Sequence, residues 1–154
     1  MRLSTKGRYA VMAMADLAER ADSGRAVTLA DIAQRQDISL PYLEQLFARL
    51  RRGGLVRSVR GPGGGYRLAR GAGETAVGEI VTAVDEPIEA VRCNSGPVGC
   101  MPGGVRCLTH DLWDDLGHHI QDYLASVTLE DVISGRLRQR RAQRSASEGA
   151  SAAA

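Results

Sequence analysis

A glycine-rich turn between two short strand-like segments constrains the fold of this chain more than any other feature. Residues 55–60 have the composition of a strand, the turn Gly61-Pro62-Gly63-Gly64-Gly65 follows, and residues 66–68 return as a second strand. Because glycine has no Cβ, such a loop can lie in the narrow minor groove of DNA, where Arg60 would meet an enhanced negative potential. The pattern predicts a β-hairpin of the kind called a wing.

Three helices are predicted before this hairpin. Apolar residues recur at helical spacing between residues 10 and 21. Thr28 with Asp31 resembles a capping box and begins a second helix that ends near Gln36. Ser39 is expected to cap a third helix. This helix has an apolar stripe made of Leu43, Leu46, Phe47 and Leu50. Its opposite, polar face is made of Glu44, Gln45, Arg49, Arg51 and Arg52.

Two short helices around a tight turn, the second rich in arginine, form the pattern of a helix-turn-helix. A purely structural helical hairpin would share this pattern, but it would rarely be followed by strands that carry Arg57, Arg60 and Arg67. We therefore predict a winged helix-turn-helix over residues 1–73. A nucleotide-binding glycine loop is excluded, because the chain has no GxGxxG between a strand and a helix and no Walker lysine before Ser or Thr.

The charge of the chain is unevenly distributed, although it sums to only +2 at pH 7. Residues 1–70 carry 13 Lys and Arg against 6 Asp and Glu, residues 71–135 carry 2 against 11, and residues 136–154 carry 5 against 1. A basic amino-terminal region suits nucleic acid, because neutralising phosphates releases condensed counterions. A merely solvated basic face would have the same charge. The helix-turn-helix pattern favours double-stranded DNA as the partner.

Three cysteines and one histidine fall within one glycine- and proline-rich stretch as Cys93, Cys100, Cys107 and His110. The sequence has no apolar leader and no run of about 18 apolar residues, so we expect a cytoplasmic protein with no membrane partner. In that reducing compartment an odd number of cysteines favours metal ligation or redox chemistry over disulfides. Thiolates with one imidazole suit zinc or an iron–sulfur cluster, and spacing alone leaves both open.

Residues 74–135 are predicted to hold this cysteine loop between helices. Thr75 is expected to cap a short helix that ends before Pro87. After the loop, a long helix carries an apolar stripe of Leu112, Leu116, Ile120, Tyr123, Leu124 and Val127. A second copy of this helix is the expected partner of the stripe, which gives a homodimer, and packing against the chain's own winged domain is the alternative. A last short helix is expected from Thr128 to Gly135, followed by a basic disordered tail at 136–154.

Four stretches of the chain resemble one family of bacterial regulators. They are Met1-Arg2-Leu3-Ser4-Thr5-Lys6-Gly7-Arg8-Tyr9-Ala10, Ile38-Ser39-Leu40-Pro41-Tyr42-Leu43-Glu44-Gln45-Leu46-Phe47, Val59-Arg60-Gly61-Pro62-Gly63-Gly64-Gly65-Tyr66 and Cys107-Leu108-Thr109-His110. In this order they closely resemble the IscR family of iron–sulfur cluster regulators, over roughly residues 1–135. The fold class expected is mainly α with a small β-hairpin wing, followed by a cluster-binding loop and a long dimerisation helix.

The resemblance implies a homodimeric transcription factor with one 2Fe–2S cluster per subunit. Such regulators mainly repress genes for cluster assembly when they hold the cluster, and some bind a second class of promoter without it. The implied ligands are Cys93, Cys100, Cys107 and His110. The implied DNA contacts are Ser39, Tyr42, Glu44, Gln45, Arg49, Arg51, Arg60, Gly63 and Gly64, with Glu44 and Gln45 facing base edges and Arg60 in the minor groove.

The chain departs from the family pattern in two places. Six residues separate successive cysteines here, against five in the usual pattern, and Pro41 stands where a small polar residue is expected. Two other functions remain open: a DNA-binding protein with a structural zinc in the same ligands, and a small redox carrier, which would leave the winged domain unused. No Ser-His-Asp or Cys-His arrangement with a third member is present, so we expect no enzyme.

Overall fold

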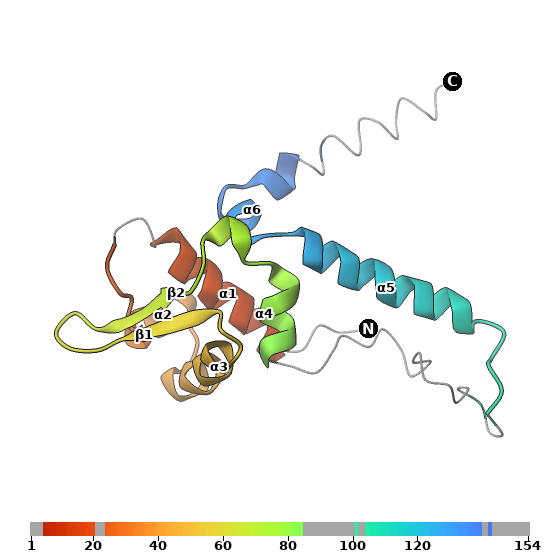
Figure 1. Cartoon of the computed structure of the whole chain (residues 1–154), viewed down its shortest axis with the longest axis horizontal. Helices are drawn as coiled ribbons and strands as arrows, with labels where there is room; N and C mark the ends of the chain where they lie inside the picture. Colours follow the sequence, from red (N-terminus) through yellow and green to blue (C-terminus); the bar gives the residue numbers. More distant parts are fainter. Residues whose placement is uncertain (1–4, 21–23, 85–100, 102–103, 140–141, 143–154) are drawn as a thin grey trace.

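The computed structural model of this 154-residue chain describes residues 5–20, 24–84, 101, 104–139 and 142. The elements in chain order are α1 (Thr5–Glu19), α2 (Leu29–Gln36), α3 (Leu40–Arg52), β1 (Val56–Val59), β2 (Gly65–Leu68), the short 3-10 helix η2 (Ala72–Glu74), α4 (Val77–Val84), α5 (His110–Ser126) and α6 (Leu129–Ile133). The helices α1 to α4 and the hairpin form one body, from which α5 projects (Figure 1). The predicted fold class, mainly helical with a small antiparallel hairpin, is confirmed.

One apolar core joins α1, α2, α3 and the hairpin. The predicted stripe of α3 is fully buried, with Phe47 at its centre, and it faces Met14 and Leu17 of α1. The ring of Phe47 also meets Tyr66 of β2 edge to face, with ring centroids 4.9 Å apart. Aromatic pairs at this separation add to the stabilisation from burial. The wing is therefore fixed directly to the back of α3.

Both ends of α2 are capped. The side chain of Thr28 accepts a hydrogen bond from the Asp31 backbone N–H at 3.1 Å, as the sequence predicts. At the other end Asp37 adopts a left-handed conformation (φ 52°), and its N–H bonds to the Ala33 carbonyl. This left-handed residue ends α2 and starts the tight turn into α3.

Two of the predicted caps are wrong. Ser39 stands at the N-cap of α3, but its side chain makes no capping hydrogen bond. Pro41, two residues after Ser39, lacks one of the N–H groups from which such a cap would accept a hydrogen bond. The hydroxyl of Thr75 turns back to the Gly71 carbonyl (3.0 Å), and Glu79 instead accepts the hydrogen bond from the Ala76 N–H before α4.

The predicted hairpin is present, with its two strands paired around the glycine turn. Val56 pairs with Leu68 and Val59 with Gly65, in antiparallel orientation. A further bridge joins Tyr66 to Val27, with N–O distances of 2.8 and 2.9 Å, and so holds the wing against the start of α2. Gly65 has φ 151°, and a Cβ there would lie 2.4 Å from the Val27 carbonyl oxygen. Glycine is thus required where the wing meets this segment.

The carboxyl-terminal helices return to the winged body. Backbone hydrogen bonds join Val77 to Val127 (2.8 Å) and Leu129 to Thr75 (3.0 Å). Thr128 and Asp131 form a reciprocal capping box at the start of α6. These bonds anchor the end of α5, whose predicted apolar stripe is otherwise largely exposed. Among the described helices, none has the length and apolar character needed to cross a membrane.

Several predicted features lie outside the described residues. They include Cys93 and Cys100, most of the loop between α4 and α5, and residues 143–154 of the expected tail. Residues 136–139 are described and helical.

Candidate nucleic-acid interface and metal centre

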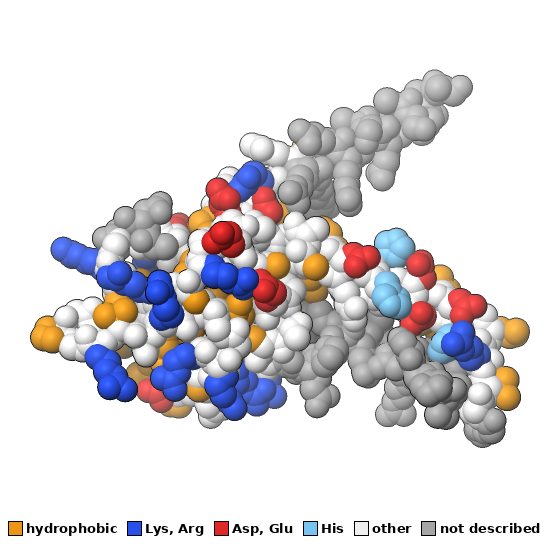
Figure 2. All heavy atoms as spheres, in the orientation of Figure 1, with side chains coloured by type: hydrophobic (Ala, Val, Ile, Leu, Met, Phe, Trp, Pro, Cys, Tyr) orange, Lys and Arg blue, Asp and Glu red, His pale blue; other side chains and the backbone are white. Residues whose placement is uncertain are grey.

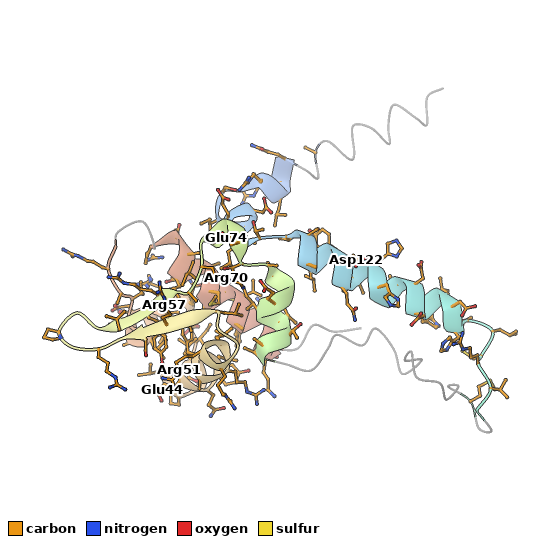
Figure 3. The ribbon with its side chains drawn as sticks, in the orientation of Figure 1. Glu44, Arg51, Arg57, Arg70, Glu74 and Asp122 are labelled. Atoms are coloured by element: carbon orange, nitrogen blue, oxygen red, sulfur yellow. The ribbon has the colours of Figure 1, made fainter. Side chains whose placement is uncertain are left out.

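The outer face of α3 presents polar side chains to solvent. Glu44, Gln45 and Arg51 are exposed, as is Ser39 at the start of the helix. Figure 3 shows Glu44 and Arg51 together on the side of α3 that faces away from the body. Tyr42 is half-buried, and its ring packs edge to face on Tyr9 of α1 at 5.9 Å. An exposed face with donors and acceptors in this order can read base edges in a major groove.

The tip of the wing carries the other predicted contacts. Arg60 is exposed at the end of β1, and Gly63 has φ 72° in the turn. Gly64 is held more closely, because a Cβ on it would lie 2.7 Å from the Val59 carbonyl oxygen. The turn is therefore compact as well as free of side chains, which suits entry into a narrow groove. Figure 2 shows that Lys and Arg side chains gather around the hairpin and α3, while acidic side chains and histidines gather along α5.

A buried carboxylate positions the helix-turn-helix. Asp16 of α1 is 3% exposed and accepts hydrogen bonds from Arg35 at 2.7 and 3.0 Å and from Gln36 at 2.8 Å. Burial alone raises the pKa of Asp16, but the hydrogen bonds from Arg35 and Gln36 and the charges of Arg35 and Arg20 outweigh it and hold that pKa below its ordinary value. This ionised group ties α1 to the last turn of α2, directly before α3.

Arg49 faces α4. Its Nη1 donates a hydrogen bond of 2.7 Å to the carbonyl of Val84, the last residue of that helix. Next to it, a Cβ built on Gly53 would lie 3.1 Å from the Cβ of Ala83. The end of α3 and the end of α4 are thus in close contact, immediately before the segment that contains Cys93.

The candidate metal ligands that the structure describes lie at the start of α5. The His110 N–H donates to the Cys107 carbonyl at 3.0 Å, so both residues belong to one turn. His110 is 3% exposed and Cys107 is half-buried, with its Sγ 3.6 Å from Thr109 Oγ1. A thiol and an imidazole in one turn are the donors that zinc and iron–sulfur centres use, so the donor set fits either.

The remaining candidate ligands are placed differently. Cys93 and Cys100 lie outside the described residues, and within the described ranges no three His, Cys, Asp or Glu side chains are grouped to hold a metal ion. His118 and His119 are exposed on α5, where each Nδ1 lies 2.9 or 3.0 Å from the carbonyl four residues earlier. Of the three histidines, His110 alone is close to a cysteine in sequence and buried.

The sequence patterns did not reveal two further groups of residues. One is the Asp16 network, for which the only signal was a charged residue on an apolar helical stripe. The other is the cross-strand pairing of Arg57 with Arg67: the sequence places both arginines on the predicted strands, and the structure shows that they lie directly opposite each other. Because successive side chains of a strand point to opposite faces of the sheet, the predicted strands could have placed both arginines on one face of the hairpin.

Comparisons with known proteins agree with this geometry. The Rrf2 family, described as iron-dependent transcriptional regulators, matches residues 3–135. An HTH-type transcriptional regulator IscR from Pectobacterium carotovorum is 57% identical over 136 residues, covering 88% of this chain and 81% of the relative. The protein of the same name from Klebsiella pneumoniae is 53% identical over 154 residues, covering 95% and 93%.

Solved structures show the same similarity. The T. potens IscR structure is 38% identical with a TM-score of 0.72, covering 88% of each chain. CymR, the global cysteine regulator of B. subtilis, is 34% identical with a TM-score of 0.74, covering 87% of this chain and 97% of that one. These relatives are named as regulators and belong to a non-enzymatic class, which confirms the expectation that the chain is not an enzyme.

Proposed function

The chain belongs to the Rrf2 family of transcriptional regulators, and we propose that it is a homodimer that senses iron–sulfur cluster status through a 2Fe–2S cluster and mainly represses cluster-assembly genes. That it is a DNA-binding regulator follows from the family. The observation that carries the finer proposal is the turn that brings Cys107 next to the buried His110 at the start of α5.

The DNA-reading part of the proposal assigns roles to described side chains. Glu44 can accept a hydrogen bond from cytosine N4, and Gln45 can pair with adenine N6 and N7 in the major groove. Arg60 would enter the minor groove with the compact glycine turn. Ser39, Tyr42, Arg51, Gly63 and Gly64 are the further proposed contacts.

The metal part assigns Cys93, Cys100, Cys107 and His110 as ligands. When bound, a 2Fe–2S cluster supplies a redox-active and chemically labile centre. His110 contributes an imidazole, which must be deprotonated to bind, so retention of the centre becomes dependent on pH. Its burial holds the ring at the start of α5, so that little side-chain freedom remains to be lost on binding.

Anaerobic purification with a visible spectrum and iron, sulfide and zinc analysis tests the metal. We expect a coloured protein with equal amounts of iron and sulfide, whereas a colourless protein that contains zinc would refute the cluster and support a structural zinc. The variant His110→Ala should lose the colour faster in air than the wild type. The control His118→Ala should keep the wild-type rate, because that ring is exposed on α5.

The homodimer rests on the exposed apolar side of α5. Leu112 is 60% exposed, Tyr123 52% and Leu116 36%. An apolar stripe of this length on a projecting helix is the kind of surface that a second copy covers. Sedimentation should show a dimer for the wild type and a monomer for Leu112→Glu, with Asp122→Lys on the same helix as a control that stays dimeric. A monomeric wild type would overturn this part of the proposal.

We propose that Arg49 transmits the state of the segment between α4 and α5, which contains the three cysteines, to α3, the proposed DNA-reading helix. Its hydrogen bond to Val84 joins α3 to the residue directly before that segment. A change in the conformation after Val84 would therefore bear on α3 through one strong, charge-assisted contact.

The coupling is measured as the ratio of DNA affinities between the loaded and the empty protein, over a panel of palindromic and non-palindromic sites. Arg49→Ala should bring this ratio close to one, whereas the control Arg52→Ala, whose side chain donates within α3 to the Ala48 carbonyl, should keep the wild-type ratio. Equal affinities for the two wild-type forms across the panel would refute the coupling.

A further inference from the structure

We propose that Arg57 and Arg67 form a second phosphate-binding surface on the outer side of the wing, which extends the DNA contact beyond the site read by α3 and Arg60. The inference rests on DNA binding by the winged domain. It adds a surface that none of the predicted contacts includes.

The two arginines are direct partners across the hairpin. Arg57 on β1 lies opposite Arg67 on β2, and both side chains are exposed. Their neighbours Val56 and Leu68 are buried against the core, so the arginines stand on the face of the hairpin that points away from it. Like charges directly opposite on two strands destabilise a hairpin. Such a pair is explained if an anion lies between or above the two guanidinium groups.

In the described ranges neither Arg57 nor Arg67 takes part in an ion pair, although Nη2 of Arg67 donates to the Gly24 carbonyl. By contrast Arg70, nearby on the same side, is bound to Glu79 by two hydrogen bonds of 2.9 and 3.0 Å. Arg25 adds a third guanidinium to the wall of the open hollow, of about 820 Å³, that Arg57 and Arg67 line, and Glu19 and Glu130 line other parts of it.

The distance of Arg57 and Arg67 from the turn of the wing is close to the depth of the minor groove of DNA. Arg57 is three residues before Arg60, and Arg67 is three residues after Gly64, which places both about 10 Å behind the turn. The minor groove of B-DNA is about 7.5 Å deep. When the turn lies at the floor of the groove, the two arginines therefore reach the level of the bordering phosphates.

The face of the hairpin on which Arg57 and Arg67 stand determines which phosphates they would contact. Figure 3 shows Arg57 on the hairpin and Arg51 and Glu44 on α3 below it. The pair stands on the face of the hairpin that points away from the core, so it would contact phosphates other than those beside α3. Each half-site on the DNA would then extend beyond the base pairs that the turn of the wing contacts.

DNA fits this surface better than a small anion. The arginines that line the hollow are exposed and the hollow is open to solvent, whereas a site for a small ligand buries most of the ligand surface. A row of exposed guanidinium groups on a hairpin is the arrangement that tracks a sugar–phosphate backbone.

The test compares two duplexes for the full-length, anaerobically purified protein. One is a site obtained by in vitro selection and trimmed at the edge of the wing contact, and the other carries eight further base pairs of neutral sequence on each side. Wild-type affinity for the longer duplex should be about tenfold higher, with a salt slope steeper by about two for each half-site, since each neutralised phosphate contributes about 0.9. The double variant R57Q/R67Q should lose this gain and bind the short duplex normally.

The control variant Arg138→Gln removes an exposed arginine that lies outside the hairpin and should keep the full gain. Equal gains for the wild type and R57Q/R67Q would overturn the inference, as would thermal stabilisation by inorganic phosphate or pyrophosphate that this variant loses while its DNA binding is unchanged. Failure of the wild type to bind either duplex would instead count against DNA binding by the winged domain itself. The outcomes of the two proposals are therefore distinct.

Discussion

Removal of the Asp16 carboxylate should destabilise the whole winged domain. Asp16 accepts three hydrogen bonds from α2, at 2.7, 2.8 and 3.0 Å, and lies 3.4 Å from Arg20 of its own helix. In Asp16→Ala, the guanidinium of Arg35 and the amide of Gln36 lose these partners together. The link between α1 and the turn before α3 is then lost.

The size of the effect follows from the burial of the two partners. Breaking a buried ion pair by removing one member costs about 3–5 kcal/mol. The Arg35 side chain is 32% exposed, so water can replace part of what it loses, and we expect the lower limit, about 3 kcal/mol. For a chain of this size, that corresponds to a fall in Tm of roughly 6–12 °C.

Thermal and urea unfolding followed by circular dichroism measure this difference. Glu19→Gln is the matched control, because Glu19 pairs with Arg20 at 3.1 Å but its side chain is 70% exposed. It should change stability by less than about 0.5 kcal/mol. If Asp16→Ala stayed within about 1 kcal/mol of the wild type, or if Glu19→Gln lost as much, the reasoning from burial and hydrogen bonding would be wrong.

Three further outcomes follow from single residues. The pKa of Asp16 is lower in the folded than in the unfolded chain, so the Asp16 carboxylate stabilises the fold fully at pH values above the ordinary pKa of 3.8. This stabilisation is lost as the pH falls below that value. Acid unfolding should therefore be steeper for the wild type than for Asp16→Asn. Gly65→Ala places a Cβ 2.4 Å from the Val27 carbonyl oxygen and should lower the free energy of unfolding in urea by at least about 2 kcal/mol. A Cβ on Gly61 has no atom within 4 Å, so Gly61→Ala should lower it by about 1 kcal/mol, because of the positive φ alone. Asp37→Gly relieves a left-handed conformation (φ 52°) and should leave stability unchanged or raise it by up to about 1 kcal/mol, while Asp37→Ala should lower it.

Patterns that repeat along the chain predicted the fold well. The stripe around Phe47 has helical spacing, and the structure buries all of it because one face of an amphipathic helix must be covered. The hairpin followed from a turn of glycines, of which Gly61, Gly63 and Gly65 have positive φ. Both signals are local, so the sequence alone is enough to recognise them.

Contacts between distant residues were less predictable. Asp16 and Arg35 are 19 residues apart, and nothing in either segment indicates the partner. The same is true of Arg49. The family resemblance implies it as a DNA contact, and in the structure its side chain donates a hydrogen bond to a carbonyl 35 residues away. For Ser39, the cap failed because Pro41 removes a donor, an effect that depends on the geometry of the first turn. The ligand set was predicted from residue types and from the family resemblance, and of its four members the described residues include Cys107 and His110.

The distribution of burial along the chain explains why the proposed sensor lies where it does. The winged body has its own core, with Phe47, Met14 and Leu17 fully covered by residues of the same chain. In α5 the one buried residue is His110, and the apolar side chains of Leu112 and Tyr123 are exposed. A segment with few buried contacts opens at low free energy, so a ligand or a second copy that binds it shifts its conformation strongly. A ligand held by His110 would therefore act on a helix whose other side chains are mostly exposed, whereas the apolar side of α3 is fully buried.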